Sequence, residues 1–205
     1  MRNVLQPFKR GSLVLLFGTM LIACAEKPIQ GSDAAVQALQ AAKQAGGMEY
    51  APEALRVAED EYQKAQEEIG LQENTFLLTR NYDAANALLA KVVADAEKAR
   101  TEAIANKQQA KTEAEAAMDL AKTSLEEAKN QLTRAPTGKG TQADLQALRG
   151  DLQAAETTLA EIDGIMTKED YLGVKAKAES VQILAARVNE QVAQANQKTG
   201  KHKKA

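Results

Sequence analysis

The sequence predicts an all-α protein: two antiparallel helical hairpins, coiled-coil-like and joined through one long helix, after a cleaved signal peptide. Three observations predict this fold class. The 205 residues include 40 alanines and are otherwise rich in Glu, Lys, Gln and Leu, with only 12 Gly and 4 Pro, a composition that favours helices. Apolar residues recur at alternating steps of three and four, the spacing of a coiled-coil seam. Aromatic residues make up only 3% of the chain, so we expect no deep aromatic pocket.

The first element is a signal peptide over residues 1–23. Three cations precede an apolar run over 12–23, which is too short to span a bilayer as a mature helix. The four residues at its end resemble the bacterial lipobox: Leu21, Ile22, Ala23 and Cys24. The resemblance implies that the chain is cut before Cys24, and that Cys24 carries a covalent diacylglycerol and an acyl chain. The alternative is an ordinary signal peptide followed by an unmodified cysteine.

The predicted lipid places the protein on a membrane, because two or more acyl chains anchor a protein stably. In the sorting pattern of two-membrane bacteria that accompanies a lipobox, Asp directly after the cysteine favours the inner membrane. Here Ala25 and Glu26 follow Cys24. The resemblance therefore implies the periplasmic face of the outer membrane, or the outer face of the plasma membrane in a host with one membrane.

Residues 24–31 are predicted to form a lipidated tether, since Pro28 and Gly31 interrupt helix formation. Ser32 has the character of an N-cap for a short helix over about 33–45, which Gly46 and Gly47 end.

The first hairpin is predicted over residues 32–135. Its first arm begins at Pro52, which suits the first turn of a helix. The seam of this arm consists of Leu55, Ala58, Tyr62, Ala65, Ile69 and Phe76. A polar corner follows, with Asn81 as an N-cap before Tyr82. We expect the best-packed part of the molecule around this corner, where apolar residues are dense: Phe76, Leu77, Leu78, Leu88, Leu89, Val92 and Val93.

The second arm continues without Pro or Gly from Tyr82 to about Arg134, a rod of roughly 75 Å at 1.5 Å per residue. Polar Gln108 and Lys111 interrupt its seam and leave open a bend or break there. A linker over 136–142 then turns the chain back.

The second hairpin, over 143–197, repeats the first at an offset of about 90 residues. Its first arm has the seam Leu145, Leu148, Leu152, Ala155, Leu159, Ile162 and Met166. Asp170 and Tyr171 form the matching corner. The apolar positions behind the two tyrosines also correspond, with Ala85, Leu89, Val92, Ala96 and Ala99 in one copy and Val174, Ala178, Val181, Ala185 and Val188 in the other. The corner tyrosines either mark a recognition surface or pack across the partner helix, and we favour packing.

A basic tail over 198–205 ends the chain with Lys198, Lys201, Lys203 and Lys204. It is either a solvated end or a contact for anionic lipid or for peptidoglycan carboxylates. Without residues 1–23 the chain has 23 basic and 28 acidic residues, a net charge of about −5, which disfavours nucleic acid as a partner.

Two segments resemble an Ala-rich domain of unknown function that is found in bacterial lipoproteins, alone or ahead of an OmpA-like peptidoglycan-binding domain. These are 51–65, with Leu55, Ala58, Tyr62 and Ala65, and 81–89, with Asn81, Tyr82 and Leu89. The resemblance covers about residues 32–100 and implies an envelope location and a helical shape, but no activity. This chain has a longer first arm over 70–79 and no OmpA-like domain.

Catalytic residues, metal ligands and cofactors other than the lipid are not expected. Cys24 is predicted to be lipidated, and His202 lies three residues from the end of the chain. The carboxylates of residues 59–61, 67 and 68 are interpreted as a solvated helix face rather than a metal site. We therefore predict a non-enzymatic structural or scaffolding protein whose seams bind a protein partner or a second copy. The alternatives are an accessory subunit of an envelope transport or secretion complex and, remotely, a peptidoglycan-modifying enzyme.

Overall fold

The computed structural model describes residues 26–136 and 142–202, with side chains as far as residue 197. It confirms the all-α fold class, because every regular element in these ranges is a helix. The elements are, in chain order, α1 (Ile29–Gln44), α2 (Gly47–Tyr50), α3 (Pro52–Glu73), the 3-10 turn η1 (Leu77–Thr79), α4 (Asp83–Thr133), α5 (Gln142–Met166) and α6 (Tyr171–His202). The predicted signal peptide and Cys24 lie outside the described residues, as do residues 137–141 of the predicted linker.

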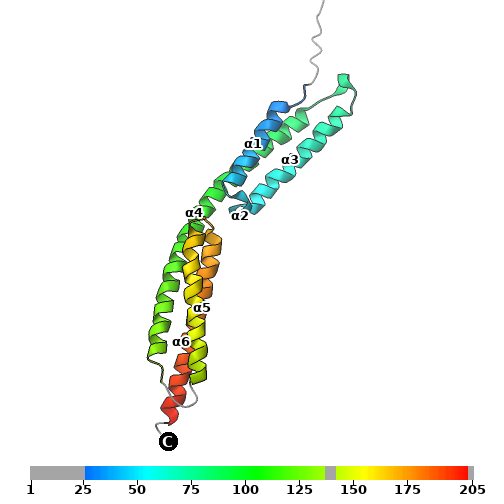
Figure 1. Ribbon diagram of the computed structural model, residues 1–205. Coiled ribbons are helices and arrows are strands. Elements are labelled where there is room, and N and C mark those ends of the chain that lie inside the picture. The colour runs from blue at the N-terminus through cyan, green and yellow to red at the C-terminus, as the bar shows by residue number, and fades with distance from the viewer. Residues whose placement is uncertain (1–25, 137–141, 203–205) are drawn as a thin grey trace, which may run out of the picture.

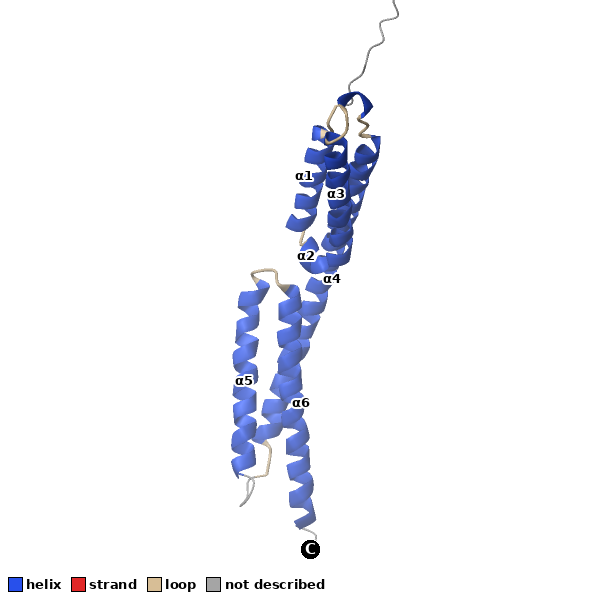
Figure 2. Cartoon of the chain, turned by 90° about the vertical axis from the view of Figure 1, so that its right-hand side faces the viewer, coloured by secondary structure: helices blue, strands red, loops and turns tan. Residues whose placement is uncertain are grey.

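The helices form two bundles placed end to end, so the molecule is a rod (Figure 1). α1, α3 and the first half of α4 make the N-terminal bundle, while the second half of α4, α5 and α6 make the C-terminal bundle (Figure 2). The helices of each bundle alternate in direction. The start of α1 and the end of α6 consequently lie at opposite ends of the rod (Figure 1).

Helix α4 joins the two bundles without a break. Its 51 residues correspond to a length of about 76 Å. The helix passes through Gln108 and Lys111, so the break that the sequence left open does not occur in α4. The burial pattern does change there, since no residue between Ala103 and Ala110 is buried. At this point α4 passes from the N-terminal bundle into the C-terminal bundle.

Helix α1 is the third helix of the N-terminal bundle, and it starts earlier than predicted. It begins at Ile29 after Pro28, and Ser32 lies inside it, with its backbone N–H donating to the Pro28 carbonyl at 3.0 Å. The predicted cap at Ser32 is therefore wrong. Pro28 takes the N-cap position instead, and its φ of −77° already suits the start of a helix. Gly31 lies against α4, where an added Cβ would stand 3.2 Å from Leu89 Cδ1.

Each predicted hairpin is part of a larger unit. α3 packs against α4 and α5 packs against α6, and a third helix completes each pair: α1 in one bundle and the second half of α4 in the other. The sequence repeat extends to these third helices. α1 ends at Gln44 and α4 ends 89 residues later at Thr133, while α3 begins at Pro52 and α5 begins 90 residues later at Gln142. The repeating unit is thus three helices, and the two units share α4.

The apolar positions behind the two corner tyrosines are all buried: Ala85, Leu89, Val92, Ala96, Ala99, Val174, Ala178, Val181, Ala185 and Val188. In the first arms, the seam includes the buried residues Leu55, Ala58, Ala65 and Ile69 of α3, and Leu145, Leu148, Leu152, Ala155 and Ile162 of α5. Alanine is frequent at these positions, so the helices come close but bury little apolar surface per residue.

The corner between α3 and α4 is not the best-packed part of the molecule, and that prediction is wrong. Phe76, Leu77 and Leu78 are 70%, 51% and 63% exposed. The reason is that α3 ends at Glu73, before the seam reaches Phe76, and the chain then turns through η1. Of the seven apolar residues expected to pack there, only Leu89 and Val92, deeper in α4, are buried.

Candidate functional site

The predicted lipobox residues Leu21, Ile22, Ala23 and Cys24 lie outside the described residues, as do Lys203 and Lys204. Lys198 and Lys201 belong to α6, which continues to His202. The helix therefore takes in the first five residues of the segment predicted as a flexible tail. None of the helices in 26–136 and 142–202 is both long enough and apolar enough to cross a bilayer.

The corner residues have structural contacts. Asn81 Oδ1 accepts a hydrogen bond from the backbone N–H of Asp83 at 2.7 Å, and Asp170 Oδ1 accepts one from the backbone N–H of Gly173 at 2.8 Å. Both bonds satisfy N–H groups in the first turn of the helix that follows. Asp170 directly precedes α6, as an N-cap does, but Tyr82 is the N-cap of α4, so the predicted N-cap at Asn81 is wrong by one residue. A Cβ at position 173 would displace the Asp170 carboxylate from its place at the start of α6.

Tyr82 and Tyr171 are buried, at 4% and 7% exposure. Tyr82 packs in the core of the N-terminal bundle, and Tyr171 packs in the core of the C-terminal bundle. Their rings are therefore parts of the packing, as the sequence interpretation favoured, and they offer little surface for recognition.

The junction between the bundles is a polar cluster that the sequence analysis missed. Asn106 Nδ2 donates to the Tyr50 carbonyl at 2.7 Å, and the Tyr50 hydroxyl donates to the Glu169 carbonyl at 3.2 Å. The Glu169 carboxylate pairs with Lys107 Nζ at 2.7 Å. Glu169 has a φ of 60°, the left-handed region that a non-glycine residue adopts only when its surroundings hold it there.

This cluster fixes how α2, α4 and the α5–α6 turn meet. The hydrogen bond to Lys107 lowers the pKa of Glu169, and the same bond raises the pKa of Lys107. Burial raises the pKa of Tyr50. The cluster borders a shallow hollow of about 220 Å³, lined by Glu49, Tyr50, Asn106, Gln109, Ala110, Glu113 and Leu172. Only the Gly46–Gly47 pair at the start of α2 signals in the sequence that the chain turns sharply here.

Two grooves lie at equivalent places in the two bundles. One runs between α1 and α3, has a volume of about 430 Å³ and is lined by Val36, Leu39, Gln40, Lys43, Glu59, Tyr62 and Gln63. The other runs between α4 and α5, has a volume of about 340 Å³ and is lined by Lys122, Leu125, Glu126, Lys129, Glu156, Leu159, Ala160 and Asp163. Each groove therefore lies where two helices of its bundle meet, and its lining is partly apolar.

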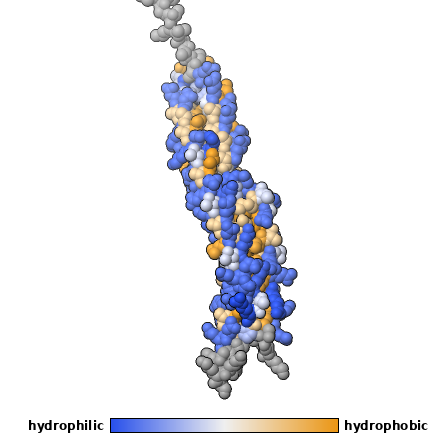
Figure 3. Space-filling view, turned by 90° about the vertical axis from the view of Figure 1, so that its left-hand side faces the viewer, coloured by the Kyte–Doolittle hydropathy of each residue, from blue (hydrophilic) through white to orange (hydrophobic). Residues whose placement is uncertain are grey.

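A Lys–Glu ion pair lies in each groove. Lys43 pairs with Glu59 at 2.7 Å in the first, and Lys129 pairs with Glu156 at 2.8 Å in the second. These pairs join the two helices on either side of the groove. Exposed apolar surface of this kind is typical of a contact with another molecule. In Figure 3, hydrophobic patches lie over both bundles on an otherwise largely hydrophilic face.

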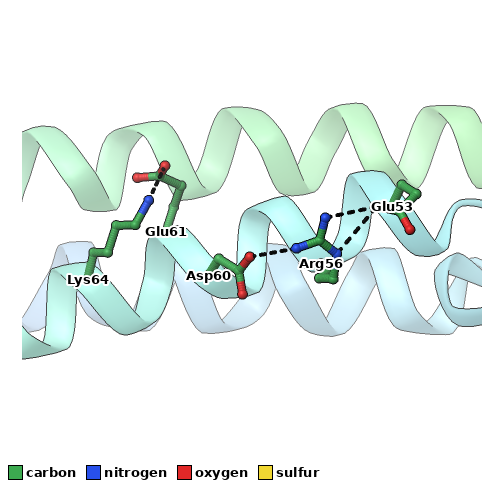
Figure 4. Close-up of polar contacts among 5 residues, drawn as sticks. All are labelled: Glu53, Arg56, Asp60, Glu61 and Lys64. Carbon is green, nitrogen blue, oxygen red and sulfur yellow. Dashed lines mark hydrogen bonds and ion pairs between the residues drawn. The ribbon is translucent and has the colours of Figure 1, made fainter.

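Of the α3 carboxylates that the sequence analysis singled out, Asp60 and Glu61 pair with cations on the same helix, and Glu59 pairs with Lys43 of α1. Arg56 bridges Glu53 and Asp60 at 2.9 and 3.0 Å, and Lys64 contacts Glu61 at 3.1 Å (Figure 4). Across residues 26–136 and 142–202, no group of three or more His, Cys, Asp or Glu side chains is placed to hold a metal ion.

Comparison with protein-family models, with curated proteins and with solved structures gives no match to this chain. The resemblance to the Ala-rich lipoprotein domain therefore stays a prediction from the residues quoted for it.

Proposed function

We propose that this protein is a lipid-anchored, non-catalytic scaffold of the bacterial cell envelope, held on the periplasmic face of the outer membrane. In a host with one membrane, the same anchor holds it on the outer face of the plasma membrane. The observation that carries the proposal is the rod: two bundles on one unbroken α4, with the start of α1 at one end and the end of α6 at the other (Figure 1). A rod anchored at one end reaches away from its membrane.

The direction of the rod indicates which partner the basic tail contacts. Lys198 and Lys201 lie in the last turns of α6, at the end of the rod away from α1. A lipid on Cys24 puts the anchoring membrane at the α1 end, and α4 alone accounts for about 76 Å of separation. This separation favours peptidoglycan carboxylates, rather than the anchoring membrane, as the contact of the tail.

The anchor is tested by Cys24→Ser in the full-length chain. Serine has no thiol to accept the diacylglycerol, so we expect unprocessed precursor and no incorporation of labelled palmitate, measured by gel mobility and autoradiography of the purified protein. Thr19→Ser, in the apolar run but outside the lipobox, is the matched control and keeps labelling. Unchanged labelling of the Cys24→Ser protein rejects the anchor.

An accessory subunit of an envelope transport or secretion complex is the second candidate, and the two equivalent grooves favour it. A photo-crosslinking residue at Gln63, which lines the α1–α3 groove, separates the candidates in intact cells, with exposed Gln66 on the same helix as control. One stoichiometric partner captured from position 63 alone supports the accessory subunit. Capture of a second copy supports a self-associating scaffold.

A further inference from the structure

The corner between α3 and α4 carries the densest group of exposed large apolar side chains in the described residues. Leu71, Phe76, Leu77 and Leu78 are 64%, 70%, 51% and 63% exposed within eight consecutive positions. Water-exposed leucine and phenylalanine side chains gathered in this way mark a surface that another phase or molecule covers.

Five backbone carbonyls at the corner accept hydrogen bonds from side chains of the same segment. Arg80 donates to the Glu73 carbonyl at 2.7 Å and to the Thr75 carbonyl at 3.0 Å. The side chains of Asn74, Thr75 and Thr79 cover three further carbonyls, those of Gly70, Leu71 and Phe76, at 2.9, 3.0 and 2.9 Å. A turn whose carbonyls are bonded internally can enter an apolar phase without leaving those groups unpaired.

The predicted anchor lies next to this corner. Lys27 Nζ pairs with Glu73 Oε1 at 2.5 Å, so the chain just before α1 is fixed against the end of α3. Cys24 is three residues before Lys27, and three residues reach at most about 10 Å. A lipid on Cys24 therefore brings the exposed corner to the bilayer surface.

We propose that the α3–α4 corner, with Phe76, Leu77 and Leu78 at its tip, inserts into the lipid surface to which Cys24 is anchored. This inference rests on the proposed lipid anchor and adds a second point of attachment. A tether alone lets the rod swivel, whereas two neighbouring contacts restrict its tilt. The corner does not need high intrinsic affinity, because the anchor makes its insertion intramolecular.

The test uses the lipidated full chain in vesicles of phosphatidylethanolamine and phosphatidylglycerol with brominated acyl chains, which quench nearby tryptophan. The chain has no Trp, so Phe76→Trp gives a single reporter at an exposed position. Ile183→Trp is the matched control, since Ile183 on α6 is also exposed, at 63%, but belongs to the C-terminal bundle. We expect the Phe76→Trp protein to lose more than half of its tryptophan emission in brominated vesicles, whereas the emission of the Ile183→Trp protein stays almost unchanged.

Mass spectrometry of the same sample separates failure of this inference from failure of the anchor. A lipidated Phe76→Trp chain whose emission is unquenched overturns the insertion and leaves the anchor standing. Blue-shifted but unquenched emission from that chain means that a second copy covers the corner, and it also overturns the insertion. If the chain carries no lipid, the anchor is rejected. Brominated vesicles added to that chain then test whether the corner inserts without an anchor, and unquenched emission overturns the insertion as well.

Discussion

Glu61 is the one charged side chain that is buried among the described residues. It occupies the inner face of α3, where the surrounding seam is apolar. Its carboxylate accepts hydrogen bonds from Lys91 at 2.8 Å and from Lys64 at 3.1 Å. Lys91 lies on α4, so this contact ties the two helices together as well as compensating the charge.

Replacing this carboxylate should change how stability depends on pH. The hydrogen bonds from Lys91 and Lys64 lower the pKa of Glu61, so the ionised form contributes stability above the unfolded-state pKa of about 4.3. This contribution is lost as the pH falls through the lower folded-state pKa. We expect Glu61→Gln to lower the melting temperature by a few degrees near pH 7 and to have almost no effect in strong acid, measured by circular dichroism.

The control for this prediction is Glu67→Gln on the exposed part of the same helix, which should leave the melting temperature unchanged at both pH values. An equal loss for Glu61→Gln at neutral and acid pH would contradict the prediction, because it would mean that packing rather than charge is lost.

At the scale of the element, alanine determines how the helices meet. Eight of the twelve buried residues of α4 are alanines, and the close contact of Gly31 with Leu89 shows how near α1 comes. Small side chains permit this approach, and close-packed helices leave little room for larger ones.

Enlarging one of these alanines should destabilise the C-terminal bundle. Ala121 is fully buried on α4, and Ala121→Leu adds a branched side chain to a space already filled, at an expected cost of about 1–3 kcal/mol in the free energy of unfolding. Urea denaturation followed by circular dichroism measures it. Ala116→Leu, an exposed position on the same helix, should be nearly neutral. Equal stability of the two variants would show that the seam is loosely packed.

The sequence predicted the helices and most of their buried faces, because spacing of three and four is a local property of the chain. The packing of the corner at Phe76 was predicted wrongly, for a reason that the spacing of apolar residues does not show. The Arg80 guanidinium reaches back to the carbonyls of Glu73 and Thr75, and so the turn closes before Phe76 can join the seam.

At the scale of the whole molecule, the sequence predicted an elongated shape and an internal repeat, but not the third helix of each bundle. One alanine-rich seam resembles another, so spacing does not say which distant segments pair. The polar junction was missed for a related reason. Tyr50, Asn106 and Glu169 are single residues outside any periodic pattern, and only the folded chain brings them together.

The continuity of α4 should set the shape of the rod. In Ala105→Pro, an exposed position just before the junction, proline removes a backbone N–H and clashes with the preceding turn, at a cost of about 3 kcal/mol. We expect small-angle scattering of the processed chain to show a broader range of dimensions than the wild type. Ala105→Gly keeps the N–H and costs about 1 kcal/mol, so its scattering should match the wild type. If Ala105→Pro also matches, the hydrogen bonds of Tyr50 with Glu169 and Asn106, rather than α4, hold the bundles in line.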